Sequence, residues 1–379
     1  MSSDNIVDKN QIHSSNLTSK DIEILISLQQ DPTIKFIELA EILSISAATA
    51  ANRYYSMVER TLNRVIADLE IGKLDLEIID VFIGSENLTN SCLIENFCEA
   101  HPYTLYRSRV FGSFNGLYLQ FRIPIGTKNL LISQLNELKQ KSGIKWFETF
   151  SHKYPKISTT MRLENWVPET HSWNFDWDSW EAKLDSQKTQ AHRTIEELDS
   201  NNEILLNQLD LLDMHILEEL TKGCARRKHV DIIKAIEDKL SPTSPLRNIP
   251  KQTFSRHFKK LNQEVITGYR LFLDWRTLDM HNSIMFRCVA NDQITASFYQ
   301  TLERYPIPFE STIRKQGDGF FWFIRLPPAQ LSDLYNIIWK NVEKLETIIF
   351  DYKSSEHYGL WHETFDVKKH KWKSLKLNI

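Results

Sequence analysis

Apolar residues recur at helical spacing in three consecutive segments near the start of the chain. The spacing predicts a helix that is capped by Thr18 with Asp21 and stops at Pro32, a second helix over residues 36–43, and a third from Ser46 to about residue 60. A three-residue turn separates the last two. Helix, short helix, tight turn and helix is the plan of a helix-turn-helix. Residues 62–66 and 74–83 are β-rich, as a wing and a following strand would be.

The pattern then changes to that of an alternating α/β unit. It predicts strands at 76–83, 103–111, 117–123 and 144–150, helices at 91–100 and 128–140, and a hairpin turn at 112–116. The order βαββαβ is that of a ferredoxin-like unit. Helices cover one face of such a sheet, so we expect its free face to be buried by a second unit, in the same chain or in another.

The whole arrangement occurs twice. The motif LxxxDxxIL starts at Leu17 and again at Leu209, and Gly116-Leu117-Tyr118 is matched by Gly319-Phe320-Phe321 at an offset of 203. The second copy predicts winged-helix helices at 211–221, 230–240 and 251–261, with Pro250 at the first position of the last, and an α/β unit from residue 283. The proline-bearing residues 241–249 are an insertion that accounts for the change of offset.

These patterns predict an α+β fold in which two winged helix-turn-helix domains alternate with two ferredoxin-like βαββαβ domains of ACT-like (RAM) type. The expected units are a loose tail at 1–16, a winged helix at 17–74, an α/β domain with an aromatic tail at 75–180, a linker at 181–208, a second winged helix at 209–280, and a second α/β domain with an aromatic tail at 281–379. The 181–208 segment is too polar for a core face and fits a solvated helix or a flexible linker.

Charge separates the two copies. Residues 222–276 carry 13 Lys and Arg against 5 Asp and Glu, whereas residues 18–73 carry 6 against 8. The helix at 251–261 has an apolar stripe of Phe254, Phe258 and Leu261. Opposite this stripe we expect DNA contacts from Lys251, Gln252, Thr253, Ser255, Arg256, Lys259 and Lys260, with Arg270 and Arg276 near the wing on phosphates. The alternative is a solvated basic helix.

The equivalent helix of the first copy carries fewer charges. It offers small and polar residues, with Thr49, Asn52 and Arg53 as the candidate DNA contacts. Its acidic flanks indicate weaker DNA binding, and it could equally pack against a partner.

A winged helix followed by βαββαβ with a Gly-Asn/Asp hairpin resembles the Lrp/AsnC (feast/famine) family of transcription regulators. The resemblance rests on domain order and covers nearly the whole chain twice, whereas the usual member has one copy. It implies a double-stranded DNA partner and a small effector, such as an amino acid, near the hairpin residues Gly112, Asn115, Gly317 and Asp318. Plain turn chemistry is the alternative for these four residues. It also implies dimerisation, so we expect a pseudo-dimer that forms a homodimer.

Composition limits the remaining possibilities. A net charge of −3 means that any DNA-binding face is local, and the four cysteines show no metal-ligand spacing, so we expect buried thiols and no metal or cofactor. With neither a signal-like nor a membrane-spanning segment in the sequence, we expect a cytoplasmic protein. The Trp-rich tails, with Trp166, Trp173 and Trp372, fit segments that cover a sheet edge, or else a ligand or partner surface.

No GxSxG, HExxH, P-loop or GxGxxG motif occurs, so no catalytic residue is expected and we expect a regulator, not an enzyme. Two alternatives stay open. Some proteins of this domain plan are sirohaem decarboxylases, and His171, His357, His362 and His370 in the tails could serve such chemistry. The other alternative is an adaptor whose winged helices bind proteins.

Overall fold

The computed structural model describes residues 17–61, 64–189, 194–198, 203–241, 243–244 and 246–373. The expected tail at 1–16 lies outside these residues. No helix in the described ranges has the length and apolar character needed to cross a membrane.

Both winged helices form where the sequence predicts them. The first has α1 (Ser19–Gln30), α2 (Phe36–Leu43), α3 (Ala47–Thr61) and β1 (Arg64–Leu69), and the second has α7 (Leu211–Lys222), α8 (His229–Glu237), α9 (Lys251–Glu264) and β9 (Ile266–Phe272). Thr18 and Asp21 form the expected capping box. Pro250 differs from its expected place: it is the N-cap of α9, and its carbonyl accepts a hydrogen bond from the Phe254 amide.

The two α/β units also form as predicted, with boundaries shifted by a few residues. The first contains β2 (Leu76–Ser85), α4 (Leu88–Ala100), β3 (Thr104–Gly112), β4 (Gly116–Pro124), α5 (Lys128–Ser142) and β5 (Ile144–Ser151). The second contains β10 (Asn282–Val289), α10 (Asp292–Arg304), β11 (Ser311–Lys315), β12 (Gly319–Leu326), α11 (Leu331–Asn341) and β13 (Lys344–Phe350). Strand orders β5-β2-β4-β3 and β13-β10-β12-β11 are those of ferredoxin-like sheets.

A glycine is required at the same place in each unit. A Cβ at Gly116 would lie 1.9 Å from the Ile83 carbonyl oxygen, and one at Gly319 would lie 1.9 Å from that of Cys288. Each glycine therefore lets the central strand approach its neighbour, which explains why this part of the repeat is recognisable in the sequence.

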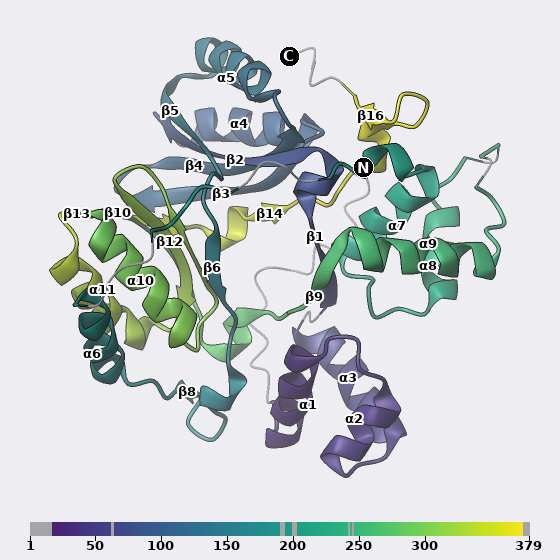
Figure 1. Cartoon of the computed structure of the whole chain (residues 1–379), viewed down its shortest axis with the longest axis horizontal. Coiled ribbons are helices and arrows are strands. Elements are labelled where there is room, and N and C mark those ends of the chain that lie inside the picture. Colours follow the sequence, from purple (N-terminus) through teal and green to yellow (C-terminus); the bar gives the residue numbers. More distant parts are fainter. Residues whose placement is uncertain are drawn as a thin grey trace.

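The two units share one sheet and bury each other's free face. Edge strand β3 pairs with β13, and the helices lie on the outer faces (Figure 1). Between the inner faces lies an aromatic cluster in which the Phe321 ring is 5.6 Å from Phe82 and 5.1 Å from Phe150, and Tyr118 is 5.3 Å from Phe350. The expected burial of the free sheet face thus takes place within the chain, between its two copies.

The segments after the two units are exchanged between the copies. The first contains β6 (Lys156–Thr159), β7 (Trp166–Val167), β8 (Ser172–Trp173) and α6 (Trp177–Lys188), and the second contains β14 (Glu356–His357), β15 (Phe365–Asp366) and β16 (Lys371–Trp372). Strand β6 pairs with β11 of the second unit, and β14 pairs with β3 of the first. The tails therefore cover a sheet edge as expected, but each covers the edge of the other copy.

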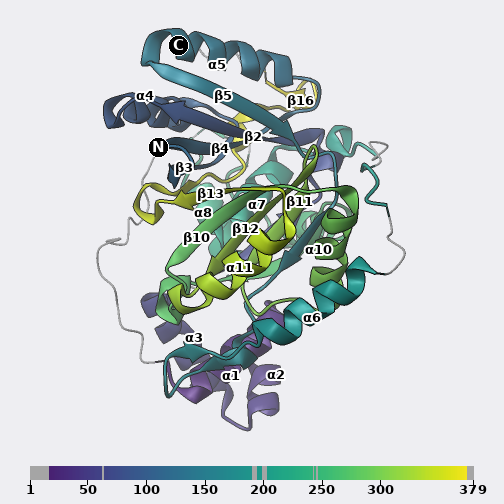
Figure 2. The same cartoon turned by 90° about the vertical axis from the view of Figure 1, so that its left-hand side faces the viewer.

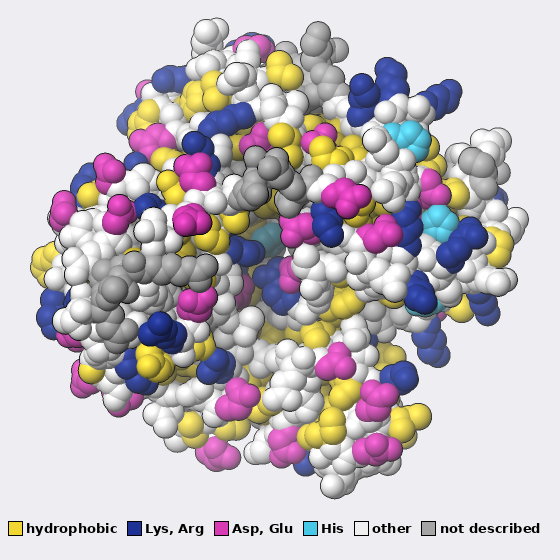
Figure 3. All heavy atoms as spheres, viewed as in Figure 1, with side chains coloured by type: hydrophobic (Ala, Val, Ile, Leu, Met, Phe, Trp, Pro, Cys, Tyr) yellow, Lys and Arg dark blue, Asp and Glu magenta, His cyan; other side chains and the backbone are white. Residues whose placement is uncertain are grey.

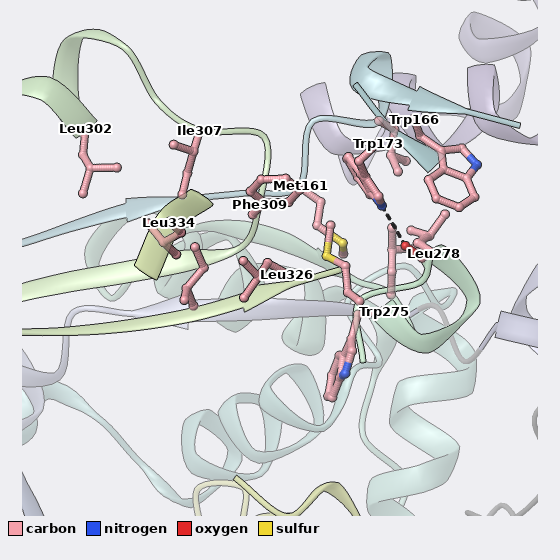
Figure 4. Close-up of a cluster of buried hydrophobic side chains, with 14 of the residues drawn as sticks. Met161, Trp166, Trp173, Trp275, Leu278, Leu302, Ile307, Phe309, Leu326 and Leu334 are labelled. Atoms are coloured by element: carbon pink, nitrogen blue, oxygen red, sulfur yellow. Dashed lines mark hydrogen bonds between the residues drawn. The ribbon is translucent and has the colours of Figure 1, made fainter. Parts of the chain in front are cut away.

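Tryptophan side chains anchor the exchanged segments. The indole N–H of Trp173 donates to the Leu278 carbonyl oxygen at 2.7 Å, at the end of a 3₁₀ turn (Trp275–Leu278) of the second copy (Figure 4). In the reciprocal contact, Trp372 donates to the carbonyl oxygen of Leu74, which ends the equivalent turn (Ile71–Leu74) of the first copy. The two contacts repeat under the pseudo-symmetry of the chain.

The predicted linker begins inside an ordered helix. Helix α6 spans Trp177–Lys188 and packs beside α10 and α11 of the second unit (Figure 2), with Trp180 and Leu184 buried. The buried side chains of α6 are Trp177, Trp180, Leu184 and Gln187, which recur at helical spacing and are enough to attach the helix to an existing domain.

Strands β1 and β9 connect the winged helices to the sheet. They pair antiparallel over six residues and form a two-stranded ribbon that joins the two copies. Arg226 adds a second link, since its guanidinium lies 4.6 Å from the Phe36 ring centroid and 4.9 Å from that of Tyr54. The pseudo-dimer is thus joined at its ribbon, its winged helices, its sheet and its tails.

Candidate functional site

Helix α9 presents a basic outer face. Phe254 and Leu261 are buried in the domain core, while Lys251, Gln252, Ser255, Arg256 and Lys259 are exposed. None of the three charged side chains among these forms an ion pair with a described residue. The basic face of α9 (Lys251, Arg256 and Lys259) is therefore available to an outside partner. Thr253 lies half-buried beside it.

Two other side chains of α9 hold the helix to α7. Asp213 is almost fully buried, and its carboxylate contacts His257 Nδ1 at 2.8 Å and Lys260 Nζ at 3.2 Å. The Lys260 ammonium also donates to the Gln208 carbonyl. Lys260, a candidate DNA contact, is thus already paired within the protein. Its contacts help to hold α9 against α7.

The first copy uses the same connection with different residues. Arg53 of α3 donates to the buried Asp21 carboxylate at 2.9 Å, and Asp21 stands in the same position of its capping box as Asp213. Thr49 and Asn52 are exposed, and the Thr49 amide donates to the Ser46 hydroxyl. Of the three candidate DNA contacts in α3, Arg53 is therefore paired within the protein. The other two, Thr49 and Asn52, are exposed but uncharged.

The surplus of positive charge in residues 222–276 is divided between surface and interior. Arg226, Arg276, Lys222, Lys239 and Lys260 have partners within the protein. Seven basic side chains are exposed without a side-chain partner among the described residues: Arg227, Lys228, Lys234, Arg247, Lys251, Arg256 and Lys259. Lys and Arg are seen over α8 and α9, whereas acidic side chains are more frequent over α1–α3 (Figure 3).

The two arginines expected near the wing both have carboxylate partners within the protein. Arg276 is bound to the Asp274 carboxylate at 2.6 and 2.9 Å, and it lies 4.3 Å from the Tyr352 ring centroid, with 12% of its side chain exposed. Arg270 belongs to the β1–β9 ribbon and lies 3.4 Å from Asp68.

Arg270 instead belongs to a charged hollow at the centre of the molecule. The space-filling view shows Lys, Arg and His side chains inside this depression (Figure 3). The charges that act on one another here come from the ribbon, from β6 and β14, and from the second sheet: Arg64, Arg270, Lys156, Glu310, Arg325 and His357. We call the depression that these six residues line the central hollow.

His357 lies at the wall of the central hollow. Its side chain keeps contact with solvent, and its ring lies 4.5 Å from that of Tyr106. Desolvation by the surrounding protein, followed by the charges of Arg325 and Arg270, lowers its pKa. The imidazole is therefore neutral at pH 7, and the arginines remain the cationic groups.

Arg325 and Glu310 form a close ion pair in the central hollow. The guanidinium lies 2.7 Å from the carboxylate and 3.9 Å from the Trp275 ring centroid, and its buried Nε has no hydrogen-bond partner. The charge of Arg325 outweighs the effect of burial and keeps the pKa of Glu310 below its usual value. An unsatisfied donor among several cations fits an anionic group, a carboxylate or a phosphate.

The hairpin residues proposed for an effector have turn or packing roles. Gly112 has φ of +107°, and a Cβ there would lie 2.4 Å from the Thr347 carbonyl oxygen of β13. The Asn115 carbonyl accepts from the Ser85 amide, and the Asp318 carbonyl accepts from that of Ala290. Gly317, with φ of +54°, is open. The central hollow is a separate place, and His357 in the tail is the only one of its residues that the sequence marked for acid/base chemistry.

Comparison with known proteins adds the following. A family model described as winged helix-turn-helix DNA-binding matches residues 17–59. No curated protein matches the chain. The crystal structure of the siroheme decarboxylase NirDL is 10% identical, with 87% of this chain and 90% of that one covered and a TM-score of 0.48.

Regulators of the AsnC family match over one copy. An AsnC family transcriptional regulator from Agrobacterium tumefaciens is 20% identical over 35% of this chain and 88% of that one, with a TM-score of 0.29. AsnC of E. coli is 14% identical over 35% of this chain and 90% of that one, with a TM-score of 0.28. From the family model, the chain contains a winged helix-turn-helix.

The expectation that the chain is not an enzyme is corrected. The solved structures that match over 87% of the chain are of an enzyme, NirDL, one of them in complex with an iron-uroporphyrin III analogue. Missing sequence motifs misled us here, because the motifs we searched for belong to other folds and cannot exclude chemistry on this one.

Proposed function

We propose that this protein is a DNA-binding transcription regulator in which α9 of the second copy enters the major groove. The observation that carries the proposal is the basic face of α9, three exposed cations without internal partners on the third helix of a winged helix. Arg256 and Gln252 suit guanine and adenine edges, and Lys251 and Lys259 suit phosphates.

The two copies would contribute unequally. Helix α3 offers exposed Thr49 and Asn52, whereas its candidate cation Arg53 is held by Asp21. Phosphate contacts supply most of the affinity for DNA, so the first winged helix would add register and shape recognition more than binding energy. We expect the cytoplasm as its location and a homodimer as its working form.

Selection of binding sites from fragmented genomic DNA, followed by footprinting, tests the proposal. The variant Arg256→Ala/Lys259→Ala should lose the footprint. The matched control Lys139→Ala/Lys145→Ala removes two exposed charges from the first α/β unit and should keep it. Equal footprints from both variants would show that α9 is not the DNA-binding helix.

A second candidate rests on the central hollow. His357 among Arg64, Arg270 and Arg325 is suited to hold a small molecule with several carboxylates or phosphates, either as an effector or as a substrate. NirDL acts on a tetrapyrrole, and a carboxylated tetrapyrrole is a ligand of this chemistry.

Absorbance titration with sirohaem separates the possibilities. Binding with loss of carboxyl groups from the product would support an enzyme, and binding without reaction would support an effector role. Arg325→Ala should weaken either one. If neither sirohaem nor simple di- and tricarboxylates bind, the hollow is not a ligand site.

A further inference from the structure

A buried histidine in the second winged helix lacks a hydrogen-bond partner. His215 of α7 is 3% exposed, and among the described residues its ring nitrogens have no donor or acceptor. The imidazole nitrogens are therefore free to take a ligand.

Two further ligand groups face His215. Glu218 follows it by three residues on the same side of α7, and His362 comes from the C-terminal segment after β14. The His215 and His362 rings lie 3.9 Å apart, and His362 Nδ1 lies 2.5 Å from Glu218 Oε2. One nitrogen from each histidine and one carboxylate oxygen all lie within 4.8 Å of one another.

The first copy has no such set at the equivalent place. The repeat aligns α1 with α7 at an offset of 192, and the turn Leu163–Asn165 with His362–Thr364. Glu23, Ile26 and Leu163 stand where His215, Glu218 and His362 stand in the second copy, and Leu163 is buried in the core. Two of these three positions are thus apolar in the first copy, so packing alone does not require two histidines and a carboxylate.

We propose that His215, Glu218 and His362 bind one divalent cation of zinc type, which joins the C-terminal segment to the first helix of the second winged helix. Two histidines and a glutamate are a ligand set that Zn²⁺ accepts, with a fourth position left for water. Small side-chain movements would bring the three atoms to bonding distances of about 2.0–2.2 Å.

The Lys222 ammonium contacts Oε1 of Glu218, while Oε2 accepts from the His362 ring and backbone amide, so a bound cation would take the place of the ring hydrogen bond at Oε2.

Titration of the full chain with Zn²⁺ against a chromogenic chelator tests the site. We expect one strongly bound Zn²⁺ per chain, and His215→Ala and His362→Ala should each weaken it by about 100-fold or more, since loss of a mere supporting group already costs about 10–100-fold. The control His281→Ala removes an exposed histidine outside the cluster and should change nothing.

A second control separates this site from the other His-carboxylate group. His257 lies near Asp210 and Asp213, but these carboxylates already serve as N-cap and as partner of Lys260. Loss of zinc binding in His257→Ala, but not in His215→Ala, would overturn the proposal, as would absence of stoichiometric binding by the unaltered chain.

Cobalt on the unaltered chain gives a result that does not depend on whether the variants fold. A four-coordinate site turns bound Co²⁺ strongly coloured, whereas six-coordinate surface sites stay pale. We expect visible bands that one equivalent of Zn²⁺ removes and that excess Mg²⁺, which prefers oxygen ligands, does not. Pale Co²⁺ at one equivalent would contradict the assignment.

Discussion

Replacing Trp173 with Phe tests the exchange of tails, on which the relative placement of the two copies depends. The indole is 6% exposed and donates to the Leu278 carbonyl oxygen at 2.7 Å (Figure 4). Phenylalanine keeps a ring but supplies no donor. Loss of the donor to a buried carbonyl costs about 1–3 kcal/mol, and the smaller ring loses about 1 kcal/mol of apolar burial.

The combined loss of about 2–4 kcal/mol should appear locally, as easier opening of the segment around β7 and β8. We expect amide hydrogen exchange there to quicken about 30-fold or more, at 1.4 kcal/mol for each factor of ten. Hydrogen exchange read by mass spectrometry resolves this segment and does not require the whole chain to unfold in one step.

The control is the same substitution at an exposed site. Trp339 is 67% exposed, so Trp339→Phe should change stability by less than about 0.5 kcal/mol. If Trp173→Phe behaves like Trp339→Phe, the tail is not held by the Leu278 carbonyl and the exchanged arrangement is wrong.

Three further outcomes follow from the contacts described above. Trp372→Phe should quicken exchange around β15 and β16 in the same way, because its indole holds the carbonyl of Leu74. Burial lowers the pKa of His101 to about 4, so only the unfolded chain takes up this proton between pH 6.5 and 4. Stability should therefore fall by up to about 3 kcal/mol across that range, and urea titrations of His101→Gln should show a shallower fall. In fluorescence anisotropy, Arg53→Ala should weaken DNA binding less than Arg256→Ala, and the reverse order would contradict the inequality of the copies.

The fold was predictable from the sequence wherever the signal is local. The capping box at Thr18 and Asp21 and the hairpin glycines before each central strand mark their elements within a few residues. Gly116 and Gly319 are conspicuous in the repeat because a neighbouring carbonyl leaves no room for a side chain. Such constraints act over a few residues or one strand pair.

The positions of the arginines were not predictable, because their partners are distant in the sequence. Arg226 contacts Phe36 and Tyr54 of the other copy, and Arg270 faces the central hollow from the ribbon. A charge count treats each of these as a surface cation. The exchange of tails brings Lys156 and His357 to Arg270, and nothing in the local pattern shows that a tail crosses to the other copy.

Of the candidate sites, the one made of residues close in the sequence was predictable, and those made of distant residues were not. The exposed face of α9 follows from helical spacing, so Lys251, Arg256 and Lys259 were found correctly as surface residues. The central hollow and the set around His215 each combine residues from segments more than a hundred positions apart. His357 and His362 were noticed in the tail, but their partners could not be named.

The salt dependence of DNA binding tests the central claim most directly. With Lys251 and Lys259 of α9 on phosphates, the slope of log K against log salt concentration should be about −1.8 or steeper, at about −0.9 for each phosphate charge neutralised. Lys251→Ala/Lys259→Ala should make this slope shallower by about 1.8, while Lys139→Ala/Lys145→Ala leaves it unchanged. If the slope is the same for the two double variants, DNA binding through α9 is contradicted.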